Sequence, residues 1–162
     1  MQLRPLDEED IPVIWSINQQ GLPGTGEVSS EEISSLLKYA SYSVGYFADE
    51  ELLGFVICMP PETEYGSLNY AWFNEHYQAF VYVDRIAVAQ EHRSKSIGTQ
   101  LYNHVVEFAS REKVPIVAEV SLMPPNPGSM RFHTRFGFKQ VGVLHHENKS
   151  VSMLMKDRVD ES

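Results

Sequence analysis

Hydrophobic and polar positions along the chain follow two periods, one typical of helices and one typical of strands. Apolar residues recur at helical spacing over 11–17 and 33–40, so both segments are expected to be helices with one buried face. Residues 2–6, 43–48 and 52–59 favour strands, and the last two are expected to form a hairpin around three acidic residues. The first third of the chain therefore predicts a strand, two helices and a hairpin.

Polar residues at the helix ends support this division. Asp7 precedes the first helical pattern as an N-cap, and the glycine- and proline-rich segment 21–26 ends it. Ser29 and Glu32 have the spacing of a capping box at the start of the second helix. We expect that helix to begin directly after Ser29.

The second half of the chain repeats the strand–helix alternation. Residues 80–88 favour a strand, and Ile97, Leu101, Val105 and Phe108 give one apolar face to a helix that runs to about Lys113. Pro115 stops that helix before a short apolar strand at 116–120, which is expected to pair in parallel with 80–88. Strands at 140–144 and 151–156 close the domain.

Composition limits what kind of protein this is. The 162 residues suffice for one domain, placed at 1–157 with a polar tail at 158–162, and 43% of them are hydrophobic. A net charge of −9 argues against nucleic acid or a membrane surface as the main partner. The single cysteine, Cys58, lies in an apolar strand and predicts a buried thiol in a reducing, cytoplasmic setting. No clustered Cys/His spacing predicts a metal.

A polar turn joins the strand at 80–88 to the helix that follows. Ser94, Ser96 and Gly98 leave room for close backbone approach, and Arg93 and Lys95 add positive charge at the helix start. Free N–H groups and the helix dipole favour an anion there, so the turn predicts a phosphate cradle. A Rossmann turn is an alternative, with Glu119 as the ribose-binding acid, but the Gly-x-Gly-x-x-Gly spacing is absent. A purely structural turn is the other alternative.

Two segments carry a family resemblance. Residues 93–99, Arg-Ser-Lys-Ser-Ile-Gly-Thr, resemble the pyrophosphate loop of the GCN5-related N-acetyltransferase (GNAT) superfamily, with Ser96 where glycine is usual. Residues 126–138 reproduce the intervals of a second GNAT motif, with Ser129 in place of alanine and His133 in place of tyrosine, similar to phosphinothricin-type acetyltransferases. The second motif predicts a helix of its own, with Asn126 as its N-cap and Gly137 as its left-handed C-terminal cap.

The resemblance implies a fold and a cofactor site. It implies an α/β GNAT fold, with a mixed sheet of about seven strands, helices on both faces, and two central strands splayed apart. The pantetheine arm of acetyl-CoA, a co-substrate, is expected to enter the gap and pair with the backbone of the central strand. The implied cofactor-binding residues are Ile86, Ala87, Val88, Arg93, Ser94, Lys95, Ser96, Ile97, Gly98, Thr99, Asn126, Ser129 and His133.

Three residues are candidates for catalysis. Strand parity places Asp84 on the same face as Tyr82, Ile86 and Val88, so Asp84 is a candidate general base unless it forms a structural ion pair with its neighbour Arg85. Glu119 is the alternative base.

His133 is the candidate acid toward the departing thiolate, and a structural role for it stays open. We predict that His133→Phe lowers turnover more than cofactor affinity.

The expected activity is direct transfer of an acetyl group from acetyl-CoA to a primary amine of a small molecule or peptide. A CoA-binding sensor without turnover, and an O-acyltransferase or one using a longer acyl chain, are the alternatives. The aromatic and acidic segment 62–76 either lines the acceptor site, with Tyr70 and Trp72 in contact with the amine, or packs onto the sheet. The closing strands suit either an acceptor site or a homodimer contact.

Overall fold

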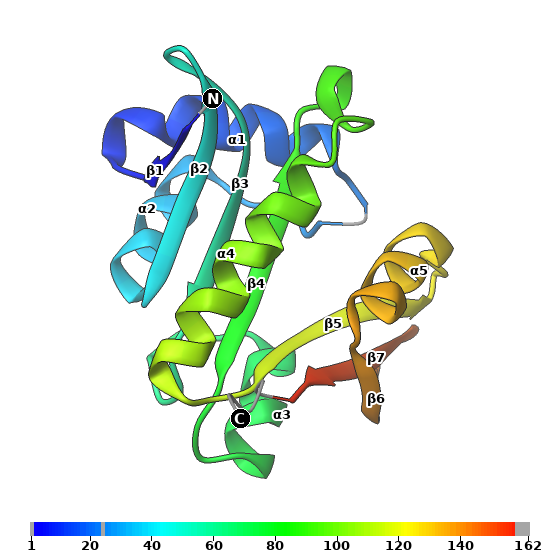
Figure 1. Cartoon of the computed structure of the whole chain (residues 1–162). Coiled ribbons are helices and arrows are strands. Elements are labelled where there is room, and N and C mark those ends of the chain that lie inside the picture. The colour runs from blue at the N-terminus through cyan, green and yellow to red at the C-terminus, as the bar shows by residue number, and fades with distance from the viewer. Residues whose placement is uncertain (1, 24, 158–162) are drawn as a thin grey trace.

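The computed structural model describes residues 2–23 and 25–157, which form one mixed sheet in the order β1-β2-β3-β4-β5-β7-β6 (Figure 1). All neighbouring strands are antiparallel except β4 and β5, which are parallel. The strand bounds are β1 Gln2–Pro5, β2 Tyr42–Ala48, β3 Glu51–Met59, β4 Val81–Val88, β5 Ile116–Met123, β6 Lys139–His146 and β7 Lys149–Lys156. The predicted seven-stranded mixed sheet is confirmed.

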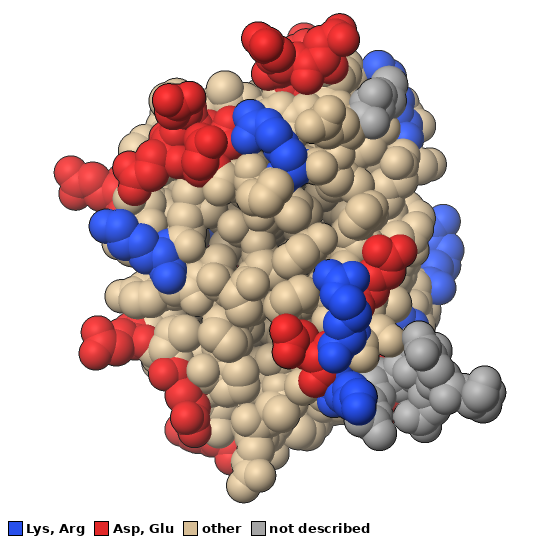
Figure 2. All heavy atoms as spheres, turned by 60° about the vertical axis from the view of Figure 1, so that its left-hand side comes forward, with Lys and Arg blue, Asp and Glu red and all other residues tan. Residues whose placement is uncertain are grey.

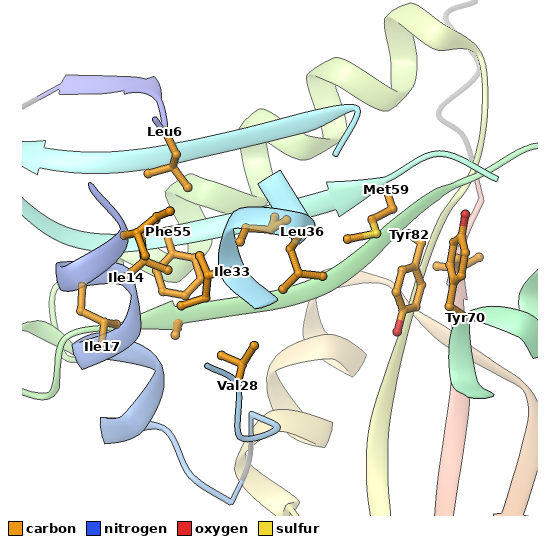
Figure 3. Packing of buried hydrophobic residues seen from close by; sticks show 14 of the residues in the cluster. Leu6, Ile14, Ile17, Val28, Ile33, Leu36, Phe55, Met59, Tyr70 and Tyr82 are labelled. Atoms are coloured by element: carbon orange, nitrogen blue, oxygen red, sulfur yellow. The ribbon is translucent and has the colours of Figure 1, made fainter. Parts of the chain in front are cut away.

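Helices cover both faces of this sheet (Figure 1). Their bounds are α1 Ile11–Gln20, α2 Ser30–Tyr39, α3 Leu68–His76, α4 Ile97–Glu112 and α5 Pro127–Phe136, with single 3-10 turns at Glu8–Asp10 and Gln90–His92. Buried side chains of α1, α2 and α3 pack in one apolar cluster, and those of α4 pack in a second cluster across the sheet, together with aromatic residues of α5. Figure 3 shows the first cluster, with Ile14, Ile33 and Leu36 facing Phe55.

The predicted caps begin and end the helices. Ser29 forms the expected capping box with Glu32 at the start of α2. Asp7 also forms a capping box, but it caps the 3-10 turn Glu8–Asp10 that precedes α1 rather than α1 itself. The Asn126 side chain accepts a hydrogen bond from the backbone N–H of Ser129. Gly137 closes α5 with φ of 103°, a left-handed conformation that favours glycine. These local signals identified the start of α2 and both ends of α5, which carries the second motif.

Helix α3 is an element that the sequence pattern did not reveal. Ser67 caps it by accepting from the backbone N–H of Tyr70, and Tyr70 and Phe73, three residues apart, are its buried residues. Large aromatic residues also occupy its other sides, so no apolar stripe distinguishes it from a loop. The helix packs Tyr70 against Tyr82 of β4, with ring centroids 5.2 Å apart (Figure 3).

A bulge at Asp84 interrupts the central strand β4. Arg85 lies opposite Ile57 while Val83 lies opposite Cys58, so Asp84 is the extra residue. The bulge reverses which face the following side chains occupy. Tyr82 belongs to one apolar cluster, whereas Ile86 and Val88 pack against the other. The prediction that Tyr82, Ile86 and Val88 share one face is therefore wrong, because parity holds only along an unbroken ladder.

Strands β4 and β5 diverge soon after they meet. Their parallel ladder contains only the pairs Val81–Ile116 and Tyr82–Val117, although each strand has eight residues. Figure 1 shows β5 turning away from β4, with α5 and the β6–β7 pair beside its far end. The splay expected from the resemblance is confirmed. It leaves the β5-facing edge of Ile86, Ala87 and Val88 without a strand partner.

Two further features are the thiol of Cys58 and the distribution of charge on the surface. Cys58 is fully buried, as predicted. Figure 2 shows acidic side chains gathered along the upper left of one side of the molecule, with basic side chains scattered among them. Among residues 2–23 and 25–157, no helix is long and apolar enough to cross a membrane, and no group of three or more metal-ligating side chains occurs. The predicted polar tail at 158–162 lies outside the described residues.

Candidate active site

Two adjoining cavities open where β4 and β5 separate. The larger has a volume of about 670 Å³ and the smaller about 490 Å³. Gly21, Thr25, Ile86, Asn126 and Ser129 line both of them. The two cavities therefore form one continuous site, bounded by the loop after α1, the splayed strand β4 and the first turn of α5.

The smaller cavity lies at the N-terminus of α4. Arg93, Ser94, Ser96, Gly98 and Thr99, which the sequence predicts to bind the cofactor, all line it. Ser96 adopts φ 61° and ψ 22°, a left-handed conformation in which its side chain makes no capping bond. This is the position where the family usually has glycine, so the serine there is strained.

Lys95 and Ile97, also predicted to bind the cofactor, do not line the cavity. The Lys95 ammonium lies 2.8 Å from Nδ1 of His92, and the Ile97 side chain is buried in the apolar cluster under α4. Only their backbone groups are near the cradle, at the turn and the first residue of the helix. Their side chains are therefore not candidates for ligand contact.

Two arginines flank the smaller cavity. Arg93 donates to the carbonyl oxygens of Gln20, at 2.8 Å, and Val88, at 3.3 Å, so its side chain ties the loop to α1 and β4. Arg135, on the last turn of α5, also lines the cavity. The sequence reasoning missed Arg135, because an exposed arginine on a helix carries no signal until α5 is placed opposite the loop.

Glu119 lies in the larger cavity within a hydrogen-bonded group. Its Oε1 accepts from the Tyr82 hydroxyl at 2.7 Å and from the Asn69 side-chain amide at 3.2 Å. Burial raises the pKa of Glu119 to about 8, although both hydrogen bonds and Arg85 oppose the shift and Asp84 adds to it. A carboxyl group with such a pKa exchanges its proton near neutral pH, as a general base or acid must.

Asp84 lies in the same cavity but is held in an ion pair. Its Oδ2 accepts from Nε of Arg85 at 2.7 Å, and the two side chains are 3% and 10% exposed. Arg85 also donates to Asn18 and to the carbonyl of Gly26. Of the two readings of Asp84 that the sequence left open, the geometry favours the structural ion pair.

His133 is fixed on both sides of its ring. It is 5% exposed, its Nδ1 lies 2.8 Å from the carbonyl oxygen of Ser129, and its Nε2 lies 2.7 Å from the Tyr102 hydroxyl. A carbonyl only accepts, so Nδ1 carries the hydrogen and Nε2 accepts from the Tyr102 O–H. Burial lowers the pKa of His133, which keeps the ring neutral.

Burial also raises the pKa of Tyr102 well above its ordinary value, so the phenol keeps its proton. Both side chains line the larger cavity. The sequence analysis did not single out Tyr102, because a tyrosine beside the apolar face of a helix reads as part of the core.

Three residues of the larger cavity each have a buried polar atom without a hydrogen-bond partner in the described residues. The atoms are Oδ1 of Asn69, Oε2 of Glu119 and Nε2 of His146. Buried polar atoms are rarely left unpaired, because the loss of water is costly. Their gathering in one cavity makes that cavity a candidate site for a polar ligand.

The aromatic segment 62–76 was expected either to line the acceptor site through Tyr70 and Trp72 or to pack onto the sheet. Tyr65 lines the cavity, but Tyr70 is buried in the core and donates to the carbonyl of Pro60. Trp72 stacks on His76, with centroids 3.8 Å apart, and does not line the cavity. For Tyr70 and Trp72 the packing interpretation is therefore the better one.

A family model described as the acetyltransferase (GNAT) family matches residues 9–138, which include both motifs and both cavity-lining helix starts. The chain is a member of the GNAT acetyltransferase family. It is accordingly an acyltransferase, and its α/β fold is the GNAT fold, as the resemblance implied. No curated protein sequence matches the chain.

Solved structures of similar fold cover nearly the whole GNAT chain. Ard1 from Thermoplasma volcanium has a TM-score of 0.80 at 15% identity, with 98% of each chain covered. The ribosomal-protein-S18-alanine N-acetyltransferase from Escherichia coli has 0.75 at 13% identity, covering 99% of this chain and 96% of its own. NAA60 from Arabidopsis thaliana, solved with a bisubstrate analogue, has 0.73 at 20% identity, with 95% of each covered. At these identities the likeness concerns the fold.

Proposed function

We propose that this GNAT protein transfers an acetyl group from acetyl-CoA directly to a primary amine of a small molecule or peptide. The observation that carries the proposal is the pair of adjoining cavities. One is lined by an anion-binding helix start, and the other contains a carboxyl group, Glu119, whose pKa lies near neutrality. Anion binding and proton transfer could thus take place in adjoining cavities beside the splayed strand β4.

The smaller cavity suits the phosphate end of acetyl-CoA. The free N–H groups at the start of α4 and the left-handed turn at Ser96 present backbone donors to an anion, and Arg135 adds a charge from the opposite side. Ile86, Ala87 and Val88 would offer the pantetheine arm the backbone groups that β5 leaves unpaired. Bound there, acetyl-CoA supplies the acetyl group as a reactive thioester.

Residues of α5 border the route between the two cavities. Asn126 and Ser129 line both of them, and Gly98 faces Phe132 across the first turn of α4. We propose that Arg93, Ser94, Ser96, Gly98, Thr99, Asn126 and Ser129 form the cofactor-binding surface. Lys95 and Ile97 would contribute through their backbone only.

Glu119 is our candidate for the general base. A free alkyl amine has a pKa near 10.4, so only about one molecule in two thousand is unprotonated at pH 7, and the site must remove a proton. Glu119 is partly buried, its pKa is raised, and the Tyr82 hydroxyl orients its carboxyl group. Asp84 has the less suitable geometry, because Arg85 occupies one of its oxygens.

The hydrogen bonds of His133 favour the structural role that the sequence left open over the role of acid. Its Nδ1–H donates to Ser129 and its Nε2 accepts from Tyr102, so neither nitrogen has a free proton to give in this geometry. We propose that His133 positions the Tyr102 hydroxyl at the floor of the cavity. Protonation of the departing thiolate by His133 would require its Nδ1–H to leave the Ser129 carbonyl.

The test combines thiol release with calorimetric binding. Wild type is expected to bind acetyl-CoA and to release CoA thiol with at least one member of a panel of primary amines and short peptides. Glu119→Gln is expected to keep acetyl-CoA affinity and lose most turnover, whereas Glu107→Gln, on the exposed side of α4, serves as the control. Binding without release from any acceptor would favour a sensor, and release with alcohols only would favour an O-acyltransferase. Absence of binding would overturn the assignment of the smaller cavity.

A further inference from the structure

Glu119 and Asn69 each leave one side-chain oxygen unpartnered in the larger cavity. The Asn69 amide nitrogen donates to Oε1 of Glu119 at 3.2 Å, and the Tyr82 hydroxyl donates to the same oxygen at 2.7 Å. Oε2 of Glu119 and Oδ1 of Asn69 remain buried with no partner in the described part of the chain. The hydrogen bond joins the two side chains, and both residues line the same cavity.

The orientation of the Asn69 amide follows from its neighbour. In the ionised form of Glu119, which is the form that can act as a base, a reversed amide would place its oxygen against a carboxylate oxygen, and two acceptors would repel each other without a hydrogen between them. The N–H side therefore faces Glu119 and the carbonyl side is free. Ser67 caps the helix two residues before Asn69, which fixes the direction from which the side chain leaves α3.

We propose that Asn69 Oδ1 and Glu119 Oε2 together hold the acceptor nitrogen by one N–H each, so that the site selects primary amines over secondary amines and alcohols. This inference rests on the proposed function and deepens it. A neutral primary amine has two N–H hydrogens and one lone pair. With both hydrogens engaged, the lone pair is the only part of the nitrogen left to face the thioester carbonyl.

Other nucleophiles leave one acceptor unsatisfied. An alcohol has one O–H, and a secondary amine has one N–H and a second carbon substituent where the other hydrogen would be. Either would bury one of the two oxygens without a donor, a loss of about one hydrogen bond, or roughly tenfold in transfer efficiency. The two oxygens therefore select nucleophiles by the number of hydrogens on the nucleophilic atom.

The proton balance of the transfer is consistent with this geometry. The nitrogen forms a bond to the carbonyl carbon, the carbon–sulfur bond breaks, and the N–H that faces Oε2 passes its proton to the Glu119 carboxylate. The thiolate takes up one proton, so the net change converts an amine and a thioester into an amide and a thiol. Asn69 keeps its hydrogen bond throughout and is a binding and positioning residue.

The test compares Asn69→Leu with wild type on matched acceptors. Wild type is expected to prefer ethylamine-type primary amines over their N-methyl and hydroxyl analogues by about tenfold or more in kcat/KM. Asn69→Leu is expected to reduce that preference to within about threefold, chiefly by raising KM for the primary amine. It should also move the pH–rate midpoint upward, because the Asn69 hydrogen bond opposes the rise in the pKa of Glu119. Asn74→Leu is the control, since Asn74 lies on the same helix but does not line the cavity, and its side chain bonds the backbone of Tyr70 and Glu62.

The two proposals fail separately. If wild type transfers to amines but Asn69→Leu keeps both the selectivity and the pH midpoint, the pairing of Asn69 with the amine is wrong and the proposed activity stands. If wild type transfers to no amine, carbon-13 NMR of the Glu119 carboxyl decides this inference without turnover. Ethylamine should then lower the pKa of that carboxyl in wild type and less so in Asn69→Leu, and an equal response in both proteins would overturn it.

Discussion

The Tyr102 hydroxyl lies 2.7 Å from Nε2 of His133, joining α4 to α5 across the floor of the larger cavity. Tyr102 is fully buried, and its ring also packs against Phe132, Phe136 and Phe138. The pair thus links the helix that begins at the phosphate cradle to the helix that begins at Asn126. Disturbing the pair should affect both stability and the shape of the site.

We predict that His133→Phe lowers the free energy of unfolding by about 1–3 kcal/mol, because it leaves the buried Tyr102 hydroxyl without an acceptor. For a chain of this size, each kcal/mol of lost stability lowers the Tm by about 2–4 °C. Adding Tyr102→Phe to His133→Phe should recover part of the loss, since it removes the orphaned hydroxyl. Thermal and urea unfolding of the four proteins of this double-mutant cycle measure the coupling.

His104→Phe, on the same helix as Tyr102, controls for a histidine replacement as such. Additive losses in the cycle would show that the two side chains do not interact. The same variants test the earlier prediction on turnover: His133→Phe should reduce kcat more than it reduces acetyl-CoA affinity, because the change lies at the larger cavity rather than at the phosphate cradle.

Glu119 should make stability depend on pH. Its folded pKa, about 8, lies above the ordinary value of 4.5, so the folded state holds a proton that the unfolded state has lost. The associated stability is fully present below about pH 4.5 and is lost as the pH rises through about 8, with a slope of at most about 1.4 kcal/mol per pH unit. Glu119→Gln, which does not titrate, should flatten this part of the curve. Urea unfolding from pH 5 to 9 measures it, and parallel curves for the two proteins would contradict the raised pKa.

Ser96→Gly should stabilise the protein by up to about 1 kcal/mol. Ser96 has φ of 61° and its side chain makes no capping bond, so glycine relieves strain and loses no contact. The expected rise in Tm is about 2–4 °C, and acetyl-CoA affinity should be kept. Ser94→Gly, two residues earlier in the same loop, should give no such gain. A lower Tm for Ser96→Gly would show that the left-handed turn is not strained.

Asp84→Asn should affect folding more than proton transfer. The Arg85 side chain is 10% exposed, and removing its carboxylate partner leaves a buried charge, which typically costs about 3–5 kcal/mol. Urea unfolding should show that loss, while the pH–rate midpoint stays where Glu119 places it. A variant that keeps its stability but loses the pH dependence of turnover would instead identify Asp84 as the base.

Local signals in the sequence were enough for most elements. Ser29 with Glu32, and Asn126 with Gly137, fixed the ends of two helices because caps depend only on neighbouring residues. Helix α3 escaped because its aromatic residues lie on several sides and give no stripe. The sequence therefore offered no reason to place Asn69 at the site, although its side chain bonds Glu119, which lies fifty positions later in the chain.

The sequence by itself determined the order of the strands and of the helices other than α3, the capped starts of α2 and α5, and the two motifs of the GNAT family, since each depends on residues close together in the chain. Only the tertiary structure distinguished the environments of the two candidate acids, Asp84 and Glu119. The bulge at Asp84 changes the face of the residues after it, and the ion pair with Arg85 occupies that carboxylate. Glu119 acquires its raised pKa from burial, which outweighs the opposing hydrogen bonds from Tyr82 on β4 and Asn69 on α3. Such properties arise from packing between distant segments, which local sequence patterns do not encode.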